Sequence, residues 1–172
     1  MDIKEETIFG KNITVKENVY LAPDKVNNNL MKNIFDYYTS TYKGKCTQKN
    51  GYIIDLIKIN RIISNFISRV DFNIVFEVEF DIIAHIPNVG DIHTCEVFLV
   101  FKEGFFAILQ NLKIFVHNNK FPKYSFDYTN STYINDDNGD VLEIGSIVQV
   151  EILGTKYKDK NFSCFGSVVL DQ

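Results

Sequence analysis

Residues 70–83 read VDFNIVFEVEFDII, and this stretch decides the fold because its apolar and polar side chains alternate with a period of two. The apolar positions are Val70, Phe72, Ile74, Phe76, Val78 and Phe80, interleaved with Asp71, Asn73, Glu77, Glu79 and Asp81. Val75 is the one apolar exception. Such alternation is typical of a strand with one buried face, so we predict a β-strand over residues 70–83.

One helix is predicted on the N-terminal side of this strand. Residues 8–21 have an extended, half-buried pattern, which Pro23-Asp24 ends while offering a helix cap. From residue 25 to 42 the apolar side chains recur every three or four residues, at Val26, Leu30, Met31, Ile34, Phe35, Tyr38 and Tyr42. We expect this stripe to pack on the protein's own sheet, and a groove for a partner is the alternative.

Two further extended segments, 44–47 and 52–59, lie between the helix and the strand. They flank residues 48–51, whose Asn50-Gly51 pair is a strong turn signal. A small sheet with one packed helix follows from these elements. Because Pro87 and Gly90 interrupt the pattern after residue 83, we place a boundary there and predict two domains, 1–83 and 84–172.

The second half is predicted to be a small antiparallel barrel. Its short strands are expected at residues 92–101, 105–109, 113–116, 141–144, 147–155 and 162–170. Residues 118–140 are polar and poorly patterned, so we predict a long loop inserted in the barrel. The fold class is therefore α+β.

Charge and cysteine usage exclude several classes of protein. The net charge of −4 belongs to the second half, because residues 1–83 carry eleven basic and eleven acidic side chains and residues 84–172 carry seven and eleven. A protein that binds duplex DNA usually has a basic excess, so the sequence argues against tight, sequence-independent nucleic-acid binding by the isolated chain. Three scattered cysteines suggest neither a zinc site nor a disulfide scaffold. The charged start and the lack of a long apolar run predict an intracellular protein without a membrane segment.

We expect no catalytic residues, no metal site and no cofactor. His85, His93 and His117 lie in separate segments, without a recognised metal-binding spacing. Ser163-Cys164 sits in a strand pattern, which favours a buried thiol over a nucleophile. The acidic residues 136–140 lack a calcium-loop pattern, which favours a solvated loop over a cation site.

Several segments resemble one known family in order along residues 8–170. They are Asn12-Ile13-Thr14-Val15, the Gly-x-Cys-x-x-x-x-Gly-Tyr run from Gly44 to Tyr52, Asp71-Phe72-Asn73-Ile74, Glu103-Gly104-Phe105, Lys113-Ile114-Phe115-Val116 and Phe165-Gly166-Ser167-Val168. This order is similar to the stalk subunits of multisubunit DNA-directed RNA polymerases, the family of the seventh subunit of eukaryotic RNA polymerase II and its archaeal counterpart. The resemblance implies a truncated RNP-like tip domain followed by an OB-fold barrel.

The resemblance implies that the first half docks to the polymerase core. Residues 43–69 are rich in basic side chains and in Ile and Phe, and surplus apolar surface beside a turn is typical of an interface. A solubilising basic surface is the alternative. The docking residues that we predict are Lys45, Lys49, Asn50, Gly51, Tyr52 and Arg61, and we expect deletion of residues 48–52 to abolish co-purification with the core.

The barrel is predicted to contact nascent single-stranded RNA weakly. Aromatic side chains on adjacent barrel strands can stack on bases, and nearby cations hold the backbone. The candidates are Phe106, Lys113, Phe115 and His117. Because side chains alternate along a strand, Phe105 and Phe106 must point to opposite faces, and so must Ile114 and Phe115. Whether Phe106 and Phe115 are the surface members stays open at this point.

The implied partners are the polymerase core subunits, a smaller stalk subunit if one is encoded, and nascent RNA. The composition is rich in Ile, Phe, Tyr and Asn, as expected from an AT-rich genome, and suits a large DNA virus. The expected location is therefore the nucleus, or a cytoplasmic viral factory or virion. The first alternative is a free-standing RNA-binding OB-barrel protein without a polymerase. The second is a structural interaction module without a nucleic-acid role.

Overall fold

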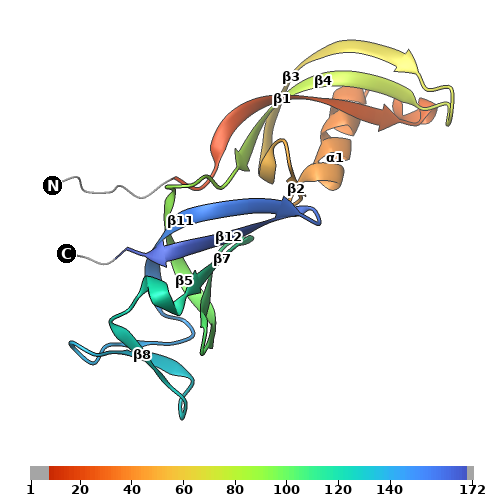
Figure 1. The fold of residues 1–172 in the computed structure, drawn as a ribbon. Coiled ribbons are helices and arrows are strands. Elements are labelled where there is room, and N and C mark those ends of the chain that lie inside the picture. Colours follow the sequence, from red (N-terminus) through yellow and green to blue (C-terminus); the bar gives the residue numbers. More distant parts are fainter. Residues whose placement is uncertain (1–7, 170–172) are drawn as a thin grey trace. The chain divides into compact units, whose positions relative to one another are not determined.

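The structure is a computed structural model, and residues 8–169 are described. The chain forms two compact units. The N-terminal unit is residues 10–86, and the barrel unit begins at Pro87 and includes residues 8–9. The division lies three residues after the expected boundary at residue 83. Strands predominate, and residues 8–169 contain a single α-helix, so the fold class is α+β as expected (Figure 1).

The N-terminal unit is built on an antiparallel sheet of four described strands in the order β1-β4-β3-β2. They are β1 (Lys11–Leu21), β2 (Cys46–Thr47), β3 (Gly51–Ile67) and β4 (Ile74–His85). Register shifts recur along β3, the first between Ile53 and Asp55 and the last between Ile62 and Ser64, so this strand is repeatedly bulged against β4. The strand predicted from residue 70 begins at Ile74, because residues 68–73 form the turn between β3 and β4.

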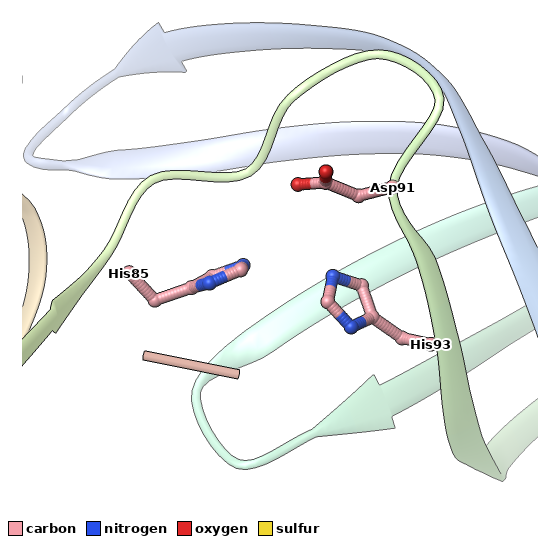
Figure 2. A group of neighbouring side chains, drawn as sticks. All are labelled: His85, Asp91 and His93. Atoms are coloured by element: carbon pink, nitrogen blue, oxygen red, sulfur yellow. The ribbon is translucent and has the colours of Figure 1, made fainter. Parts of the chain in front are cut away.

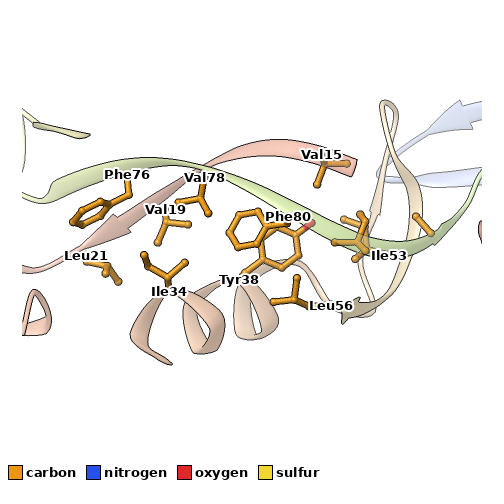
Figure 3. Close-up of a cluster of buried hydrophobic side chains, with 12 residues drawn as sticks. Val15, Val19, Leu21, Ile34, Tyr38, Ile53, Leu56, Phe76, Val78 and Phe80 are labelled. Carbon is orange, nitrogen blue, oxygen red and sulfur yellow. The ribbon is translucent and has the colours of Figure 1, made fainter. Parts of the chain in front are cut away.

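The helix α1 (Leu30–Tyr42) covers one face of this sheet. Its Ile34 and Tyr38 are fully buried against β1 and β4, and the Tyr38 ring lies 4.3 Å from that of Phe80 (Figure 3). The buried residues of this core are Val15, Val19, Leu21, Ile34, Tyr38, Ile53, Leu56, Phe76, Val78, Phe80, Ile82 and Ala84. The apolar stripe therefore packs on the protein's own sheet. The alternation in β4 provides five of these core residues, Phe76, Val78, Phe80, Ile82 and Ala84, and β1 and β3 provide the others that come from the sheet.

The helix begins at Leu30, five residues after the predicted start at residue 25. Residues Pro23–Lys25 form a short 3-10 helix, η1, in place of the first α-helical turn. The side-chain oxygen of Asn27 accepts a hydrogen bond from the Asn29 N–H at 2.9 Å. Asparagine side chains that bind the nearby backbone in this way compete with helix formation.

The helix-free face of the sheet is polar. The outward side chains of β4 on this face include Glu79 and Asp81. Arg61 of β3 lies 3.3 Å from the Glu79 carboxylate, and the Thr14 hydroxyl of β1 donates to Asp81 at 2.7 Å. The hydrogen bond from Thr14, together with one from the Asn60 amide, holds the pKa of Asp81 below its usual value. One face of β4 therefore builds the core and the other builds a charged surface.

The barrel unit contains a closed barrel of five described strands. They are β5 (Ile92–Phe101), β6 (Gly104–Leu109), β7 (Leu112–His117), β11 (Ile147–Lys158) and β12 (Asn161–Val168). The order around the barrel is β11-β12-β7-β6-β5, and β11 pairs with β5 to close it. The pair β7 and β12 is parallel, which corrects the prediction of an antiparallel barrel. A parallel pair needs a long crossover, and residues 118–160 supply it.

The predicted loop at residues 118–140 is wrong, because this segment forms a sheet of its own. After η2 (Asn118–Lys120) it contains β8 (Tyr124–Asp127) and β9 (Thr132–Asn135), which pair with β10 (Val141–Leu142) in the order β10-β9-β8. We call residues 118–142 the insert. Phe121 and Tyr133 are fully buried, with ring centroids 4.8 Å apart. These two large side chains give the insert an apolar core despite its polar composition.

A hydroxyl ties the insert to the turn between β5 and β6. The Tyr133 hydroxyl lies 2.7 Å from the Lys102 carbonyl and 3.0 Å from the Phe101 carbonyl, and it donates its one hydrogen to this pair. Burial raises the pKa of Tyr133 to about 12.

Across residues 8–169, no helix combines the length and the apolar character that crossing a membrane requires.

Candidate functional site

Phe106 and Phe115 lie side by side on the outside of the barrel. They are partners in the antiparallel pair β6–β7, and their ring centroids are 5.2 Å apart. Their neighbours Phe105 and Ile114 are fully buried in the barrel interior. Because side chains alternate along a strand, Phe105 and Ile114 hold the core positions, and Phe106 and Phe115 hold the surface positions.

Two further phenylalanines of β5 extend this surface. Phe101 stacks on Phe115 with nearly parallel rings 5.8 Å apart, and it lies 5.8 Å from Phe106. Phe98 lies 5.9 Å from Phe106. We call Phe98, Phe101, Phe106 and Phe115 the aromatic patch. The sequence reasoning missed Phe98 and Phe101, although both lie in a segment that it predicted to be a strand.

Lys113 and His117 flank the aromatic patch on β7. The Lys113 ammonium lies 5.5 Å from the centre of the Phe98 ring. His117 is exposed and meets the Phe115 ring edge-on at 6.1 Å. Its Nδ1 accepts a hydrogen bond from the Asn119 N–H at 3.2 Å, so the neutral imidazole carries its hydrogen on Nε2. The structure thus brings all four predicted RNA-contacting residues together on one surface.

This arrangement can bind flat rings and anionic groups. Half-buried aromatic rings offer π-faces for stacking, and the lysine beside them offers a cation for a phosphate. The arrangement therefore has the components of a nucleic-acid-binding surface.

The three central residues of the predicted docking segment are buried in the N-terminal unit. Asn50 donates from its side chain to the Glu17 carboxylate at 3.2 Å, and Tyr52 is 4% exposed. Gly51 has φ of +71°, and a Cβ there would lie 2.2 Å from the carbonyl oxygen of His85. Asn50, Gly51 and Tyr52 therefore belong to the packed base of the β2–β3 turn.

The basic residues of the predicted docking set are exposed. Lys49 lies 3.8 Å from the Glu17 carboxylate, and Arg61 lies 3.3 Å from Glu79. Lys45 also faces solvent. The three side chains come from different places on the sheet, since Arg61 lies ten residues beyond the β2–β3 turn along β3. They form a spread basic surface instead of one compact patch.

The β3–β4 turn presents the most exposed apolar side chains of the N-terminal unit. Val70 is 92% exposed and Phe72 is 74% exposed, and the preceding Phe66 and Ile67 are also exposed. We call these four residues the hairpin tip. Phe72 has φ of +57°, a left-handed conformation that costs a phenylalanine free energy. Exposed apolar side chains on a strained turn are typical of a binding surface.

Figure 2 draws a group of two histidines and an acid that the sequence reasoning did not consider together. His85 ends β4, is buried, and accepts a hydrogen bond from the Gly10 N–H at 3.4 Å. Asp91 accepts from the Asn88 N–H at 2.8 Å, and the buried His93 meets the Phe9 ring edge-on at 6.1 Å. His85 belongs to the N-terminal unit and the other two to the barrel unit, so we assign no joint site.

The other two segments considered for chemistry have structural surroundings. Cys164 is buried in β12. In the acidic segment, Asp137 lies 2.7 Å from the Lys123 ammonium, and Asp136 accepts from the Ser125 hydroxyl at 3.1 Å. Both carboxylates therefore have partners within the insert.

Comparison with known proteins places this chain beside polymerase subunits. DNA-directed RNA polymerase II subunit RPB7 of Glycine max is 26% identical over 160 residues, which cover 91% of this chain and 90% of that protein. DNA-directed RNA polymerase II subunit 7 of Arabidopsis thaliana is 25% identical over the same shares. DNA-directed RNA polymerase II subunit rpb7 of Dictyostelium discoideum is 23% identical over 91% of this chain and 92% of its own length.

No model of a protein family matches the chain. Among solved structures, the apo form of Mycoplasma genitalium RNase R is similar over 45% of this chain and 13% of its own, with a TM-score of 0.38 and 12% sequence identity. The similarity to subunit 7, in contrast, extends over nearly the whole of both chains.

Proposed function

Because the chain is an RPB7-like stalk subunit of a DNA-directed RNA polymerase and acts in transcription, we propose that it works by binding at both units. The N-terminal unit docks to the polymerase core, and the barrel unit contacts nascent single-stranded RNA weakly. The observation that carries this proposal is the similarity to three subunit 7 proteins over 91% of the chain. The relatives come from two plants and Dictyostelium, so the viral source stays a prediction.

The strand order supports an OB-type barrel. The consecutive strands β5, β6 and β7 are neighbours, β12 lies parallel beside β7, and β11 closes the barrel onto β5. OB-folds are five-stranded barrels of Greek-key type that bind oligonucleotides on their second and third strands. Those strands are β6 and β7, which carry Phe106 and Phe115. The aromatic patch therefore lies where such a barrel binds nucleic acid.

The hairpin tip is the surface that we propose for docking to the core. Its apolar side chains are exposed, while Asn50, Gly51 and Tyr52 of the predicted docking set are buried. The exposed Lys45 and Lys49 lie at the other end of the β3–β4 hairpin, beside the β2–β3 turn, and Arg61 lies between the two ends. These three cations would therefore make charge contacts separate from the hairpin tip. The Gln48–Tyr52 deletion is a poor test, because it removes the buried Tyr52 and the Gly51 backbone that packs on His85.

A double substitution, Val70→Asp with Phe72→Asp, tests the docking proposal. Both side chains lie in solvent, so the variant is expected to fold, whereas charges buried in an apolar interface are costly. Expressed with an affinity tag in the native source, the variant should lose the largest polymerase subunits that the unaltered chain recovers. Tyr128→Asp, at another exposed aromatic residue, is the matched control. Full recovery of polymerase by the double variant would contradict docking through the hairpin tip.

The aromatic patch with Lys113 and His117 is the surface that we propose for RNA. Stacking of a base on an aromatic ring is worth about 1–3 kcal/mol, which suits a weak contact made inside a large complex. Phe106→Ala combined with His117→Ala is expected to weaken the binding of single-stranded RNA by the assembled polymerase. Tyr128→Ala is again the control. Unchanged RNA binding in the double variant would make the site assignment wrong.

Affinity purification also separates this function from its alternatives. Polymerase largest subunits, together with a smaller stalk partner, are expected to co-purify with the tagged chain. Ribosomal material in their place would favour a free-standing RNA-binding barrel. Neither class of partner would favour a structural module.

A further inference from the structure

The row of aromatic side chains on the barrel continues past the aromatic patch onto β12. Phe165 pairs with Phe115 across the parallel strands β12 and β7, and paired positions on neighbouring strands lie on the same face. The flanking Cys164 and Gly166 are buried, so Phe165 points outward, and it is 53% exposed. Phe106, Phe115 and Phe165 therefore follow one another on three adjacent strands.

A glycine on the next strand lets the Phe165 ring lie flat against the barrel. Gly154 of β11 is the partner of Phe165, and a Cβ at Gly154 would lie 2.1 Å from Cε1 of that ring. The ring thus covers the bare backbone of β11. It keeps about half of its surface in solvent, as a stacking platform requires.

Lysines run beside the aromatic row. Lys113 lies two residues before Phe115 on β7, and Ser163 lies two residues before Phe165 on β12. Lys113 pairs with Ser163, and Ser163 pairs with Lys156 of β11. All three side chains are exposed. Positions two residues apart on a strand share a face, so this polar row lies on the same outer surface as the aromatic row. Lys158 and Lys160 follow at the β11–β12 turn, Lys158 at 3.9 Å from the Asp159 carboxylate.

The charges of the barrel unit are therefore partly separated in space. Residues 84–172 contain seven basic side chains, and four of them lie on β7 and the β11–β12 hairpin: Lys113, Lys156, Lys158 and Lys160. The same elements carry two acidic side chains, Glu151 and Asp159, so four positive and two negative charges leave a local excess of two positive charges. Five of the eleven acidic side chains lie elsewhere, in the insert and the residue after it: Asp127, Asp136, Asp137, Asp140 and Glu143. A net acidic half can thus present a locally basic surface to an anionic strand.

We propose that the RNA-binding surface extends from the aromatic patch across the parallel β7–β12 pair to the β11–β12 hairpin. Phe165 provides a further stacking position, and Lys156 and Lys158 contact phosphates of the same single strand. This proposal rests on the proposed RNA contact of the barrel and specifies the direction in which the strand continues. OB-type barrels also use the loop between their fourth and fifth strands, which is the β11–β12 turn in this chain.

The stacking position is tested with the full chain and a fluorescent twelve-nucleotide oligouridylate. Phe165→Ala should weaken binding about five- to 160-fold, the effect of losing one stacked base. Gly154→Ala should also weaken binding, because the new Cβ would displace the Phe165 ring while the backbone stays in place. Tyr128→Ala is the aromatic control and should bind as the unaltered chain does. Unchanged affinity in either Phe165→Ala or Gly154→Ala would overturn the proposal.

The phosphate contacts are tested by the salt dependence of the same binding reaction. Each phosphate contact contributes about 0.7 to the slope of log affinity against log salt concentration for a single strand. Lys156→Gln with Lys158→Gln should therefore lower the magnitude of the slope by about 1.4. Lys123→Gln, which removes an exposed lysine of the insert, should leave it unchanged. An unchanged slope in the double variant would overturn the phosphate contacts.

Failure of this extension is distinguishable from failure of the RNA contact itself. If Phe106→Ala weakens binding while Phe165→Ala and the lysine variants do not, the barrel binds RNA and the extension is wrong. If the unaltered chain, alone and within the polymerase, does not bind the oligonucleotide, both the extension and the RNA contact are wrong.

Discussion

Phe72→Asn is the substitution that best separates a docking role of the hairpin tip from a structural one. Phe72 holds φ of +57° while its N–H donates to the Ser68 carbonyl at 3.2 Å. A left-handed backbone costs an ordinary residue about 1–2 kcal/mol, and asparagine pays less because its short side chain can hydrogen-bond locally. The substitution therefore recovers backbone free energy at this turn.

The free energy lost with the ring is smaller. Full burial of a phenylalanine is worth about 1.5–3 kcal/mol, and Phe72 is 74% exposed, so about a quarter of this, roughly 0.4–0.8 kcal/mol, is at stake. We expect the free energy of unfolding to stay the same or to rise by up to about 1 kcal/mol. At the same time the variant should recover less polymerase, since the aromatic side chain that we propose for docking is gone.

Urea unfolding of the purified full chain measures the first effect, and affinity purification measures the second. Tyr128→Asn serves as the control for purification, because it removes an aromatic ring of similar exposure from the barrel unit. A loss of more than about 1.5 kcal/mol in Phe72→Asn would refute the reasoning, since the ring would then be structural. Increased stability together with full recovery of polymerase would refute its role in docking.

Three further outcomes are expected. Gly51→Ala should destabilise the chain by at least about 2 kcal/mol in urea unfolding, because its Cβ meets the His85 carbonyl oxygen at a positive φ, and a loss under 1 kcal/mol would contradict this. Tyr133→Phe should cost about 1 kcal/mol in the same assay, the value of its hydrogen bond to the β5–β6 turn, whereas no loss would make that bond unimportant. Because the pKa of Asp81 is lower in the folded than in the unfolded chain, Asp81 stabilises the fold at pH values above its unfolded pKa of about 3.9. This stabilisation is lost as the pH falls through the folded pKa. Thr14→Val should flatten this part of the acid-unfolding curve, and an unchanged curve would show that the hydroxyl is not responsible.

Patterns among residues close together in the sequence predicted the buried faces of β4 and α1 and the alternation along the barrel strands. The alternation in residues 74–83 gave the inner face of β4, and the helical spacing of Ile34 and Tyr38 gave the face of α1 that packs on it. Alternation also predicted that one residue of Phe105 and Phe106, and one of Ile114 and Phe115, faces solvent. In the structure, the outer members are Phe106 and Phe115.

Features that depend on unusual backbone or on distant pairing were not predictable in this way. The turn at residues 68–73 interrupts a period-two pattern with a left-handed phenylalanine, a conformation that phenylalanine rarely adopts. The insert has a core of few large side chains, including Phe121 and Tyr133, in a polar segment without periodicity. Phe165 joins Phe115 through a parallel pair of strands whose residues are fifty positions apart.

Averaging charge over a half of the chain also hid the organisation of the barrel unit. The net deficit of residues 84–172 counted against duplex-DNA binding and limited the expected RNA contact to a weak one. A net charge does not say where the charged side chains lie. In the structure, β11 carries two lysines beside the aromatic row, and the acidic residues of the insert lie on separate strands and turns. Local charge and not net charge governs the approach of an anionic strand.

The register shifts along β3 have a consequence for self-association. β3 pairs with β2 only at its first two residues, so most of its outer edge has no strand partner among residues 8–169. A regular open edge is a template on which another copy can add a strand, and aggregation begins in this way. The repeated bulges between Ile53 and Ser64 break the even spacing of hydrogen-bonding groups that such a template needs. The long ribbon that carries the hairpin tip can thus project an apolar end while its flank resists polymerisation.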